Sequence, residues 1–554
     1  MAKDVFTFLV GGKAGEGVKK AGSVAARLFS DLERNVFQLD EYESLIRGGH
    51  NFSVVSTSER ELSSHYIHAD VVVALDKRSY TTHEKHIAPG GTLVYNSDAM
   101  GAGQWAGVGI PFTSKAKGIP NPELHYGAGA VAVLAAALGI EHEKLKALLA
   151  SEYPRDVENN VNYGLAIHEA ALPLLGGKYK LGRGKARRPL LGGNEAIALG
   201  AYLGGLDLYF AYPMTPSSTL LHFLAARGKQ LGVTVMHPES EVAVANLAIG
   251  ATYTGARAML GTSGGGFGLM VEAFSLAGMS ESPLLCVYAQ RPGPSTGAAT
   301  LHEQSDLGFA VSAGHGEFPR LVASPADMGE ALLLASEMME LVWRFQTPGI
   351  LLTEKHLAES SMSVDVDLSK AKWSEPLVHK DGEYKRYRIT EDGVSPLLFP
   401  PSKELVKWSS HEHMESGLYS EKPEWLIAMH DKRRRKGEAL VEHLKKMRTV
   451  NVTGSGEPLI ITYGSTTMMV KEALAAGGLK ATVVQPIYLE PFPAWEMERY
   501  RGAKPIVVEQ SSTGVFAKYL REKAGIEARS VIPRYDGHPF DPEELAAKLR
   551  EATP

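Results

Sequence analysis

Residues 284–297, Leu-Leu-Cys-Val-Tyr-Ala-Gln-Arg-Pro-Gly-Pro-Ser-Thr-Gly, join an apolar run directly to a turn rich in Gly and Pro. Two earlier junctions have the same form, and their expected strands are 206–212 and 256–261. Helical patterns separate the three strands, and such alternation predicts an α/β sheet with mainly parallel strands. Because ligands bind beyond the carboxyl ends of parallel strands, we expect a functional site at these junctions.

The same alternation recurs on both sides of this region, so the predicted fold class is α/β with several domains. A chain of 554 residues has room for three or four domains at ~150 residues each. We expect α/β domains at 1–180, 193–360 and 451–554, a charged linker at 181–192 and an irregular connector at 361–450. The connector includes a basic, helix-like run at 431–436.

The composition excludes several classes of function. Lys and Arg number 58 against 63 Asp and Glu, a formal charge of −5, so nucleic acid is not an expected partner. The single cysteine, Cys286, cannot form an intrachain disulfide, a four-thiolate zinc site or a cysteine-ligated iron–sulfur cluster. Any such cluster would have to come from another chain.

The apolar stretches indicate neither secretion nor membrane insertion. The run at 5–10 lacks the basic region and the length of a signal peptide, so we expect a cytoplasmic protein. The longest apolar stretch, 127–140, is shorter than the ~20 residues that span a bilayer, and charged residues 141–144 follow it. We expect this stretch to be a buried helix.

The first junction is 212–218, Tyr-Pro-Met-Thr-Pro-Ser-Ser. Its pattern predicts Thr215 as the N-cap and Pro216 as the first residue of a helix that runs to Gly228. The N–H groups at such a helix start can hold an anion such as a carboxylate. A helix cap that touches no ligand has the same spacing, so both interpretations stay open here.

The second and third junctions also have two interpretations each. Residues 261–268, Gly-Thr-Ser-Gly-Gly-Gly-Phe-Gly, let a ligand approach the backbone closely, but they also suit a plain strand-to-helix turn. In the third junction Arg291 directly follows the strand, where a guanidinium usually has an anionic partner. That partner is a ligand in one interpretation; in the other, Arg291 lies on the surface or pairs with Glu303 or Asp306.

An apolar helix expected at 237–250 carries Glu239 and Glu241 in its first turn. Glutamates there commonly offset the helix dipole at the surface. The two residues lie on roughly opposite sides of the helix, so one of them faces the side that buries Ala245 and Ala248. We assign the buried position to Glu241, because a buried carboxylate can bond a heterocyclic nitrogen and change its protonation.

Together these strings resemble the 2-oxoacid:ferredoxin oxidoreductases, specifically the large subunit in which a gamma-type domain precedes the alpha subunit. Residues 212–218 and 290–297 match two signatures of that family, and Thr-Ser-Gly-Gly-Gly at 262–266 lies between them. The resemblance covers nearly the whole chain. Other family-like strings are 11–17 and 46–50 in the gamma-type domain, and 388–396 and 433–436 in the connector.

The resemblance implies a gamma-type domain at 1–180, a thiamine-diphosphate pyrimidine-binding domain at 193–360 and a transketolase C-terminal-like domain at 451–554. It implies oxidative decarboxylation of a 2-oxoacid, such as 2-oxoglutarate or pyruvate, with coenzyme A to acyl-CoA, CO₂ and reduced ferredoxin. Thiamine diphosphate would be shared with a beta subunit that holds the diphosphate, Mg²⁺ and a [4Fe-4S] cluster. The assembly would be (alpha-beta)₂, with no metal on this chain.

The resemblance also implies roles for single residues. Glu241 would bond N1′ of the aminopyrimidine and favour the imino tautomer that takes the proton from thiazolium C2. Thr215, Arg291 and Thr300 would bind the substrate carboxylate and nearby atoms. The remaining cofactor contacts would be Tyr212, Pro213, Ser263 and Gly264.

Some features depart from the family or favour a rival. The connector reads Ser-Pro-Leu at 395–397 where Ser-Pro-Arg is usual, and 509–511 reads Glu-Gln-Ser where the family has Glu-(Gln/Asn)-Asn, which leaves coenzyme A contacts open. An NAD(P)-dependent dehydrogenase is one rival, although no Gly-x-Gly-x-x-Gly begins at Gly11 or Gly12. A non-catalytic scaffold subunit is the other, and the sequence does not indicate the preferred 2-oxoacid.

Overall fold

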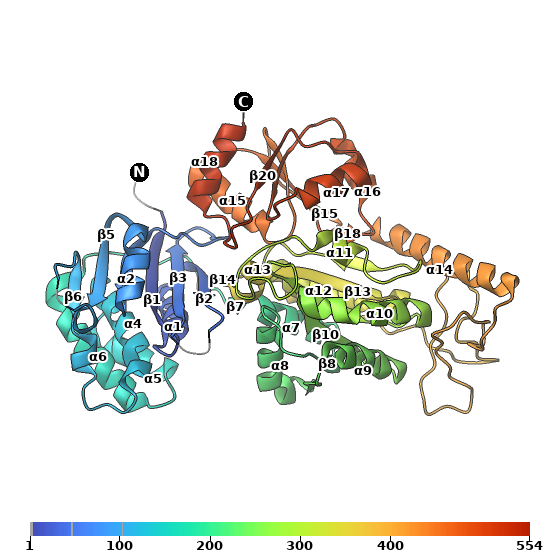
Figure 1. The fold of residues 1–554 in the computed structure, drawn as a ribbon, viewed down its shortest axis with the longest axis horizontal. Helices are drawn as coiled ribbons and strands as arrows, with labels where there is room; N and C mark the ends of the chain where they lie inside the picture. Colours follow the sequence, from blue (N-terminus) through green and yellow to red (C-terminus); the bar gives the residue numbers. More distant parts are fainter. Residues whose placement is uncertain (1–3, 46–47, 102, 554) are drawn as a thin grey trace. The chain divides into compact units, whose positions relative to one another are not determined.

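The computed structural model describes residues 4–45, 48–101 and 103–553, which form two compact units (Figure 1). Unit 1 comprises residues 1–191, 360–365 and 541–543. Unit 2 comprises residues 192–359, 366–540 and 544–554. Of the family-like string 46–50, residues 46 and 47 lie outside the described residues.

Unit 1 contains an eight-stranded sheet in the order β6-β5-β4-β1-β3-β2-β14-β7. Its strands are β1 (Phe6–Lys13), β2 (Asn35–Tyr42), β3 (His50–Ser58), β4 (Ala69–Ala74), β5 (Ile87–Asn96), β6 (Val108–Ile110), β7 (Leu190–Gly192) and β14 (Ser361–Ser363). Strands β1, β4, β5 and β6 are parallel, but β3 is antiparallel to both β1 and β2. The seven residues between β2 and β3 are too few for the crossover that parallel pairing needs.

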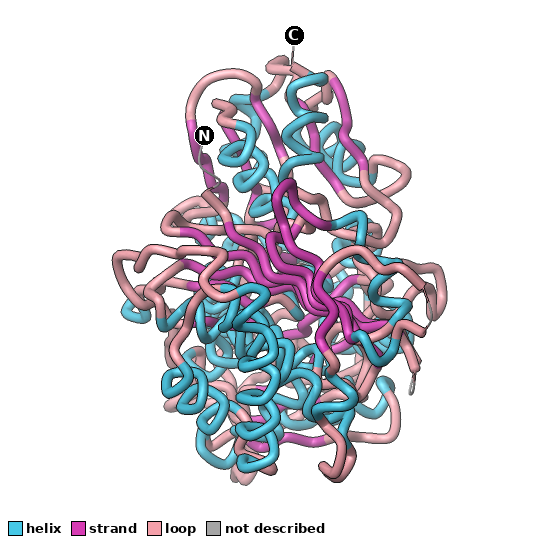
Figure 2. The backbone as a smooth tube through the Cα atoms, turned by 90° about the vertical axis from the view of Figure 1, so that its left-hand side faces the viewer, coloured by secondary structure: helices cyan, strands magenta, loops and turns pink. Residues whose placement is uncertain are grey.

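Helices cover both faces of this sheet (Figures 1 and 2). Helices α1, α4, α5 and α6 pack on one face, and α2 packs on the other. The bounds are α1 (Val18–Asp31), α2 (Lys77–His83), α3 (Phe112–Lys115), α4 (Tyr126–Ala137), α5 (His142–Glu152) and α6 (Val157–Leu175). Every residue of α4 is buried, which confirms the buried helix expected at 127–140. Among the described helices, none combines the length and the apolar character needed to cross a membrane.

Unit 2 contains a seven-stranded sheet in the order β18-β12-β13-β11-β10-β8-β9, parallel except for β18. The strands are β8 (Leu208–Phe210), β9 (Thr234–Met236), β10 (Ala258–Thr262), β11 (Leu285–Gln290), β12 (Leu321–Ala323), β13 (Gly349–Glu354) and β18 (Tyr488–Glu490). The helices are α7 (Gly193–Leu203), α8 (Ser218–Leu231), α9 (Glu241–Tyr253), α10 (Gly264–Ser280), α11 (Leu307–Val311), α12 (Met328–Phe345) and α13 (Lys355–Glu359). The three strands expected before the junctions are β8, β10 and β11, with ends that differ by a few residues.

The C-terminal part of unit 2 adds a five-stranded sheet in the order β15-β17-β16-β19-β20. Its strands are β15 (Val450–Gly454), β16 (Leu459–Ile461), β17 (Thr482–Pro486), β19 (Ile506–Glu509) and β20 (Ser530–Pro533), and its helices are α15 (Thr466–Gly477), α16 (Ala494–Met497), α17 (Val515–Ala524) and α18 (Pro542–Ala552). One apolar core joins the two sheets of unit 2, with Val322 and Ile350 in the same cluster as Ile461 and Val507. Most strand pairs of the chain are parallel, which confirms the predicted fold class.

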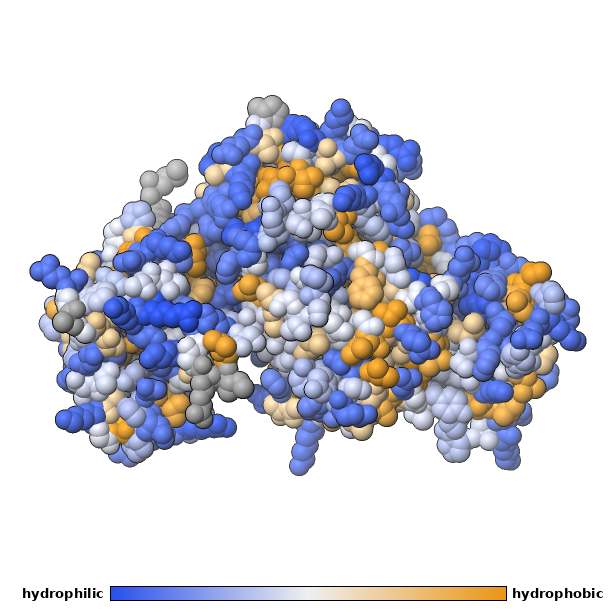
Figure 3. All heavy atoms as spheres, viewed as in Figure 1, coloured by the Kyte–Doolittle hydropathy of each residue, from blue (hydrophilic) through white to orange (hydrophobic). Residues whose placement is uncertain are grey.

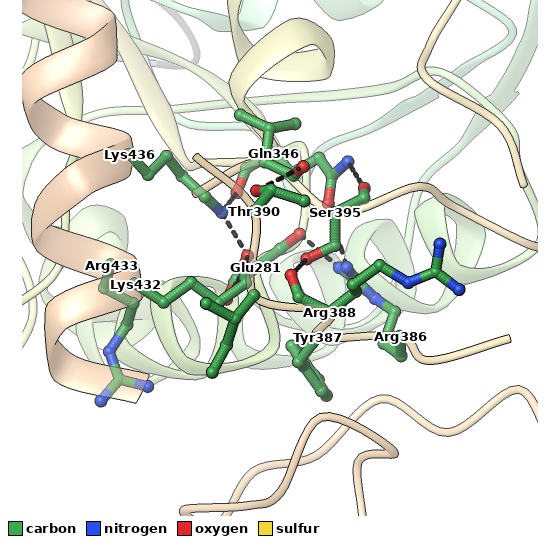
Figure 4. A network of polar contacts seen from close by, with 12 residues as sticks. Glu281, Gln346, Arg386, Tyr387, Arg388, Thr390, Ser395, Lys432, Arg433 and Lys436 are labelled. Carbon is green, nitrogen blue, oxygen red and sulfur yellow. Dashed lines mark hydrogen bonds and ion pairs between the residues drawn. The ribbon is translucent and has the colours of Figure 1, made fainter. Parts of the chain in front are cut away.

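The connector is attached to the rest of unit 2 by a buried cluster of charges (Figure 4). The basic run at 431–436 lies in α14 (Pro423–Leu444), so the expected helix is confirmed. Lys432 and Lys436 are fully buried and both donate to Glu281, Lys432 at 2.7 and 2.8 Å. Burial raises the pKa of Glu281, but the two lysines outweigh burial and hold the pKa well below its usual value.

The same cluster closes the ends of two helices. Arg386 donates to the carbonyl oxygens of Ser280, the last residue of α10, and of Glu281, its C-cap, at 2.9 and 2.8 Å. It also donates to Gln346 Oε1 at 3.0 Å, directly after α12. Cations at helix C-termini interact favourably with the helix dipole. The basic residues of the connector therefore fix the C-terminal ends of α10 and α12.

Replacing Glu281 is expected to destabilise the protein strongly. In Glu281→Ala two buried ammonium groups lose their carboxylate, and breaking a buried ion pair from one side costs ~3–5 kcal/mol. Urea unfolding of the purified protein measures this loss. Glu438→Ala is the matched control, because its ion pair with Arg434 is exposed and surface substitutions change stability by ~0.5 kcal/mol or less. Equal midpoints for the two variants would contradict the role assigned to the cluster.

Candidate active site

The three strand-end junctions meet in the structure. Arg291 Nη1 donates to the carbonyl oxygen of Thr215 at 2.8 Å, which joins the third junction to the first. The N–H of Gly266 in the second junction lies 3.3 Å from Met214 Sδ. A Cβ built on Gly265 would lie 3.8 Å from both Met214 Cε and the Ser295 carbonyl oxygen. The carboxyl ends of β8, β10 and β11 therefore form one site.

The first junction differs from its prediction. Helix α8 begins at Ser218 with Ser217 as its N-cap, and the Thr215–Pro216 peptide is cis, so Thr215 is not the N-cap and Pro216 is not the first helical residue. Residues 214–217 instead form a turn in which the N–H and hydroxyl of Ser217 donate to the Met214 carbonyl oxygen at 2.9 and 2.8 Å. This turn presents the Thr215 carbonyl oxygen to Arg291.

Arg291 is a buried cation without an anionic partner among the described residues. It is 8% exposed, and its hydrogen bond is the one to the Thr215 carbonyl oxygen. Asp306 pairs elsewhere, accepting from Tyr288 OH at 2.8 Å, and Glu303 forms no ion pair with Arg291. Burial lowers the pKa of Arg291. A buried charge is costly until an opposite charge compensates it, so the pocket favours an anionic ligand.

Glu241 is the buried carboxylate of the site. Helix α9 begins at Glu241 with Ser240 as its N-cap, so Glu239 precedes the helix, and the expectation of two glutamates in its first turn is wrong. Glu239 is exposed, whereas Glu241 is 5% exposed. Among the described residues, none donates a hydrogen bond to the Glu241 carboxylate or forms an ion pair with it. Its position on the buried side is thus as expected from the sequence.

The glycines of the second junction make room for Glu241. A Cβ built on Gly266 would lie 2.6 Å from Glu241 Oε1 and would also overlap Thr262 Oγ1. Real Cβ atoms do not approach other atoms so closely. Gly266 is therefore required where the first turn of α10 passes the carboxylate, which the glycine pattern alone could not show.

The other predicted site residues belong to the three junctions and to the loop that follows β11. Ser263 is the N-cap of α10 and is fully buried, and its Oγ has no hydrogen-bond partner among the described residues. Thr300 is buried in the loop that follows β11, but no hydrogen bond described for it reaches Arg291 or Glu241. Tyr212 and Pro213 are exposed, and the Tyr212 ring lies 5.7 Å from that of His237. No group of three or more His, Cys, Asp or Glu in the described ranges is arranged to hold a metal ion.

Gly264 faces a polar contact that the sequence did not reveal. A Cβ on Gly264 would lie 3.0 Å from Asp306 Oδ2 and 3.4 Å from Tyr288 OH. Asp306 also receives structural support, because its N–H donates to Gln290 Oε1 at 3.0 Å. These residues brace the turn around Gly264 from the third junction. Their one sequence signal is that Tyr288 and Gln290 belong to the strand that directly precedes Arg291.

Comparison with known proteins places this geometry in a family. Residues 199–429 match the family model for pyruvate flavodoxin/ferredoxin oxidoreductase, thiamine-diphosphate binding, and residues 7–169 match the model for pyruvate ferredoxin/flavodoxin oxidoreductase. The 2-oxoglutarate synthase subunit KorA of Archaeoglobus fulgidus is 30% identical over 64% of this chain and 96% of its own length. The chain belongs to the 2-oxoacid:ferredoxin oxidoreductase family.

Other members of the family match over nearly the full chain. The alpha subunit of 2-oxoacid:ferredoxin oxidoreductase from Sulfolobus sp. is 28% identical over 98% of this chain and 96% of its own length. The solved structure of 2-oxoglutarate:ferredoxin oxidoreductase from Magnetococcus marinus, with 2-oxoglutarate, coenzyme A and succinyl-CoA bound, has a TM-score of 0.88 at 29% identity. That match covers 99% of this chain and 100% of the solved chain.

Membership of the 2-oxoacid:ferredoxin oxidoreductases associates the three junctions with thiamine diphosphate binding. They lie in the region that matches the thiamine-diphosphate-binding model, and the chain is an alpha subunit of a multi-subunit oxidoreductase. The model that matches residues 7–169 belongs to the same family, so a nicotinamide site at 11–17 is not supported.

Replacing Gly266 by Ala is expected to displace the Glu241 carboxylate. The new methyl group would lie within 2.6 Å of Glu241 Oε1, and a misplacement of about 1 Å in a site can cost ~100-fold in rate. Affinity for thiamine diphosphate and turnover of the purified enzyme measure the loss. Gly268→Ala in the same helix is the control, because a Cβ there meets nothing within 4 Å. Wild-type values for Gly266→Ala would contradict the close approach of these two residues.

Proposed function

We propose that this alpha subunit, together with a beta subunit, oxidatively decarboxylates a 2-oxoacid with coenzyme A to acyl-CoA, CO₂ and reduced ferredoxin. The observation that carries the proposal is that one site contains both a buried carboxylate, Glu241, and a buried guanidinium, Arg291. Among the described residues, neither has an oppositely charged partner. The family models and relatives support the same reaction class.

The residues fit the pyrimidine end of thiamine diphosphate. A buried carboxylate without a donor suits a ring nitrogen, and the orphaned Ser263 hydroxyl and the glycine-lined turn leave backbone and hydroxyl groups for a ligand. When bound, thiamine diphosphate supplies the carbon nucleophile that attacks the keto carbon. Glu241 would hold N1′ of the aminopyrimidine and favour its imino tautomer. Tyr212, Pro213, Ser263 and Gly264 would line the ring.

Arg291, with Thr215 and Thr300, would bind the 2-oxoacid. The guanidinium is fixed by the Thr215 carbonyl oxygen through Nη1, which leaves its other N–H groups for the substrate carboxylate. A carboxylate bound there would compensate the buried charge of Arg291. Loss of CO₂ from this carboxylate would then remove the compensating charge, so Arg291 favours the bound 2-oxoacid anion over neutral CO₂.

A beta subunit would supply the redox centre. Cys286, the single cysteine, is fully buried in β11, and burial raises the pKa of its thiol, so it is not available as a cluster ligand. We assign the [4Fe-4S] cluster, Mg²⁺ and the diphosphate contacts to the beta subunit. Two electrons from each 2-oxoacid would pass singly through the cluster to ferredoxin.

The surface beside the site is suited to a second subunit. Unit 2 exposes apolar side chains near α10 (Figure 3). Exposed apolar residues on and around α9 and α10 are Met236, Val242, Leu247, Leu269 and Phe309. Several exposed apolar side chains in one region of a protein are typical of a protein interface. We assign it to the beta subunit in an (alpha-beta)₂ assembly in the cytoplasm, where ferredoxin and coenzyme A are at hand.

We assign one role to each domain that the sequence predicts. Residues 1–180 would serve as the gamma-type domain, 193–360 as the pyrimidine-binding domain and 451–554 as the transketolase C-terminal-like domain. The linker at 181–192 and the connector at 361–450 would join them. Coenzyme A, as the acyl acceptor, is the ligand we propose for the gamma-type domain.

The reaction is tested by co-expressing the chain with a beta-subunit gene. We expect viologen reduction that requires both a 2-oxoacid and coenzyme A, with 2-oxoglutarate and pyruvate compared as substrates. NAD⁺ reduction by the isolated chain, without a 2-oxoacid-dependent viologen signal in the complex, would contradict the proposal.

Glu241→Gln is expected to abolish turnover while the urea midpoint stays near that of the wild type. The amide keeps the shape of the side chain but cannot take up a proton, and losing an essential acid–base group costs ~100- to 10,000-fold. Glu239→Gln is the control, because Glu239 is exposed and outside α9. Normal turnover in Glu241→Gln together with loss in Glu239→Gln would move the role to Glu239.

Arg291→Ala is expected mainly to raise the KM for the 2-oxoacid. Removing a charged partner of a bound carboxylate costs ~1.5–3 kcal/mol, which corresponds to a KM increase of about 10- to 150-fold. The KM for coenzyme A should stay unchanged, which steady-state viologen assays measure separately. A rise confined to the KM for coenzyme A would show that Arg291 binds a different substrate.

A further inference from the structure

The loop at 291–306 carries two proposed substrate residues, Arg291 and Thr300, and connects β11 to α11. Its start is held by the hydrogen bond from Arg291 to the Thr215 carbonyl oxygen. Its end is held at Asp306, whose N–H donates to Gln290 Oε1 and whose carboxylate accepts from Tyr288 OH. Between these points the loop is supported by residues of the C-terminal sheet.

Gln304 is the main point of that support. The residue is 1% exposed, and its backbone N–H donates to the backbone carbonyl oxygen of Gln510 at 2.8 Å. Its side chain donates to Glu354 Oε2 at 3.1 Å and accepts from Thr466 Oγ1 at 2.6 Å. Its carbonyl oxygen accepts from Tyr463 OH at 3.1 Å. Three of these four partners belong to the C-terminal part of unit 2.

Gln510 follows β19 directly and is the second centre of the network. It is 1% exposed, and its Nε2 donates to Thr466 Oγ1 at 2.9 Å, so its side chain and its carbonyl oxygen both connect to Gln304. Its amide also lies against the ring of His302, and burial lowers the pKa of His302 to about 3, so the ring is neutral. The backbone N–H of His302 donates to the Gly537 carbonyl oxygen at 2.9 Å.

The network leaves little space for the loop to shift. A Cβ built on Gly464 would lie 2.6 Å from Gln304 Nε2 and 3.0 Å from Ser324 Oγ, and Gly464 has a positive φ of 58°. The two sheets of unit 2 are already joined by an apolar core, so adhesion does not require buried amides. Buried polar networks impose one geometry on the groups that they join.

We propose that Gln510 is a positioning residue that acts through Gln304 and fixes the 291–306 loop, so that Arg291 and Thr300 meet the substrate carboxylate. This inference rests on the proposed function and extends it, because it gives the C-terminal domain a part in 2-oxoacid binding. It also assigns a purpose to the string 509–511. Glu509 within that string has a local task, since its carboxylate accepts from the N–H groups of Phe516 and Ala517 at the start of α17.

The test uses the complete enzyme with its beta subunit and the variant Gln510→Met. Methionine keeps the length of the side chain but loses the amide donor to Thr466. We expect the KM for the 2-oxoacid to rise ~5- to 30-fold while kcat falls less than about 3-fold and the KM for coenzyme A does not change. Gln510→Asn, which retains an amide, should raise the KM less.

A double-mutant cycle distinguishes positioning from a general loss of structure. If Gln510 acts through the loop that carries Arg291, adding Gln510→Met to Arg291→Ala should raise the KM by a smaller factor than in the wild type, because one of the two groups that it positions is already absent. Thr462→Val is the matched control, since the buried Thr462 hydroxyl donates to the Val508 carbonyl oxygen in the same sheet without contacting the loop. Its KM should be that of the wild type.

Thr466→Val provides a second route if Gln510→Met does not assemble, because it breaks the same bridge between Gln510 and Gln304. The proposal is overturned if these variants raise the KM no more than Thr462→Val, or if their effects multiply with that of Arg291→Ala. A wild-type complex that shows no 2-oxoacid-dependent activity would instead refute the proposed function, so the two failures are distinct.

Discussion

The hydrogen bond from Arg291 Nη1 to the Thr215 carbonyl oxygen is the contact on which the site depends. It joins the ends of two strands, β8 and β11, that lie on either side of β10 in the sheet. It also holds a guanidinium inside the protein without a carboxylate among the described residues to neutralise it. Because burying an unpaired charge is unfavourable, the arrangement makes sense when an anion completes it.

Helix α10 connects this site to the connector. At its first turn Gly266 lies against Glu241, and at its end Glu281 lies among Lys432, Lys436 and Arg386 (Figure 4). The two lysines stabilise Glu281 as a carboxylate, and Arg386 donates to the carbonyl oxygens at the end of the helix. A helix fixed at its far end keeps its first turn in place, so the basic run of the connector supports the position of Glu241 from a distance.

The sequence predicted the α/β class, the three strand ends and the burial of Glu241, because each depends on local pattern. It failed where tertiary contacts decide. The N-cap is Ser217 and not Thr215, because residues 214–217 form a turn. In this turn the Thr215 carbonyl oxygen accepts a hydrogen bond from Arg291. Strand β2 has no alternating apolar pattern, because its buried positions include polar residues such as Gln38 and Asp40.

The residues that pattern could not reveal are those whose partners lie far away in the chain. Gln304, Thr466 and Gln510 look unremarkable in sequence, yet they form one buried network between the two sheets of unit 2. Lys432 and Lys436 likewise look like a solvated basic face until they meet Glu281. In both cases the residue types were clear from the sequence, but the pairing of partners that lie 44 or more residues apart was not.

The central claim is that Glu241 and Arg291 hold the cofactor and the substrate at the same strand ends. The most direct measurement is an experimental structure of the complete enzyme with thiamine diphosphate and a 2-oxoacid. We expect a Glu241 carboxylate oxygen within hydrogen-bonding distance, about 2.6–3.2 Å, of the aminopyrimidine N1′, and the Arg291 guanidinium within the same range of the substrate carboxylate. A cofactor ring bound away from Glu241, or a substrate carboxylate held without Arg291, would contradict the account.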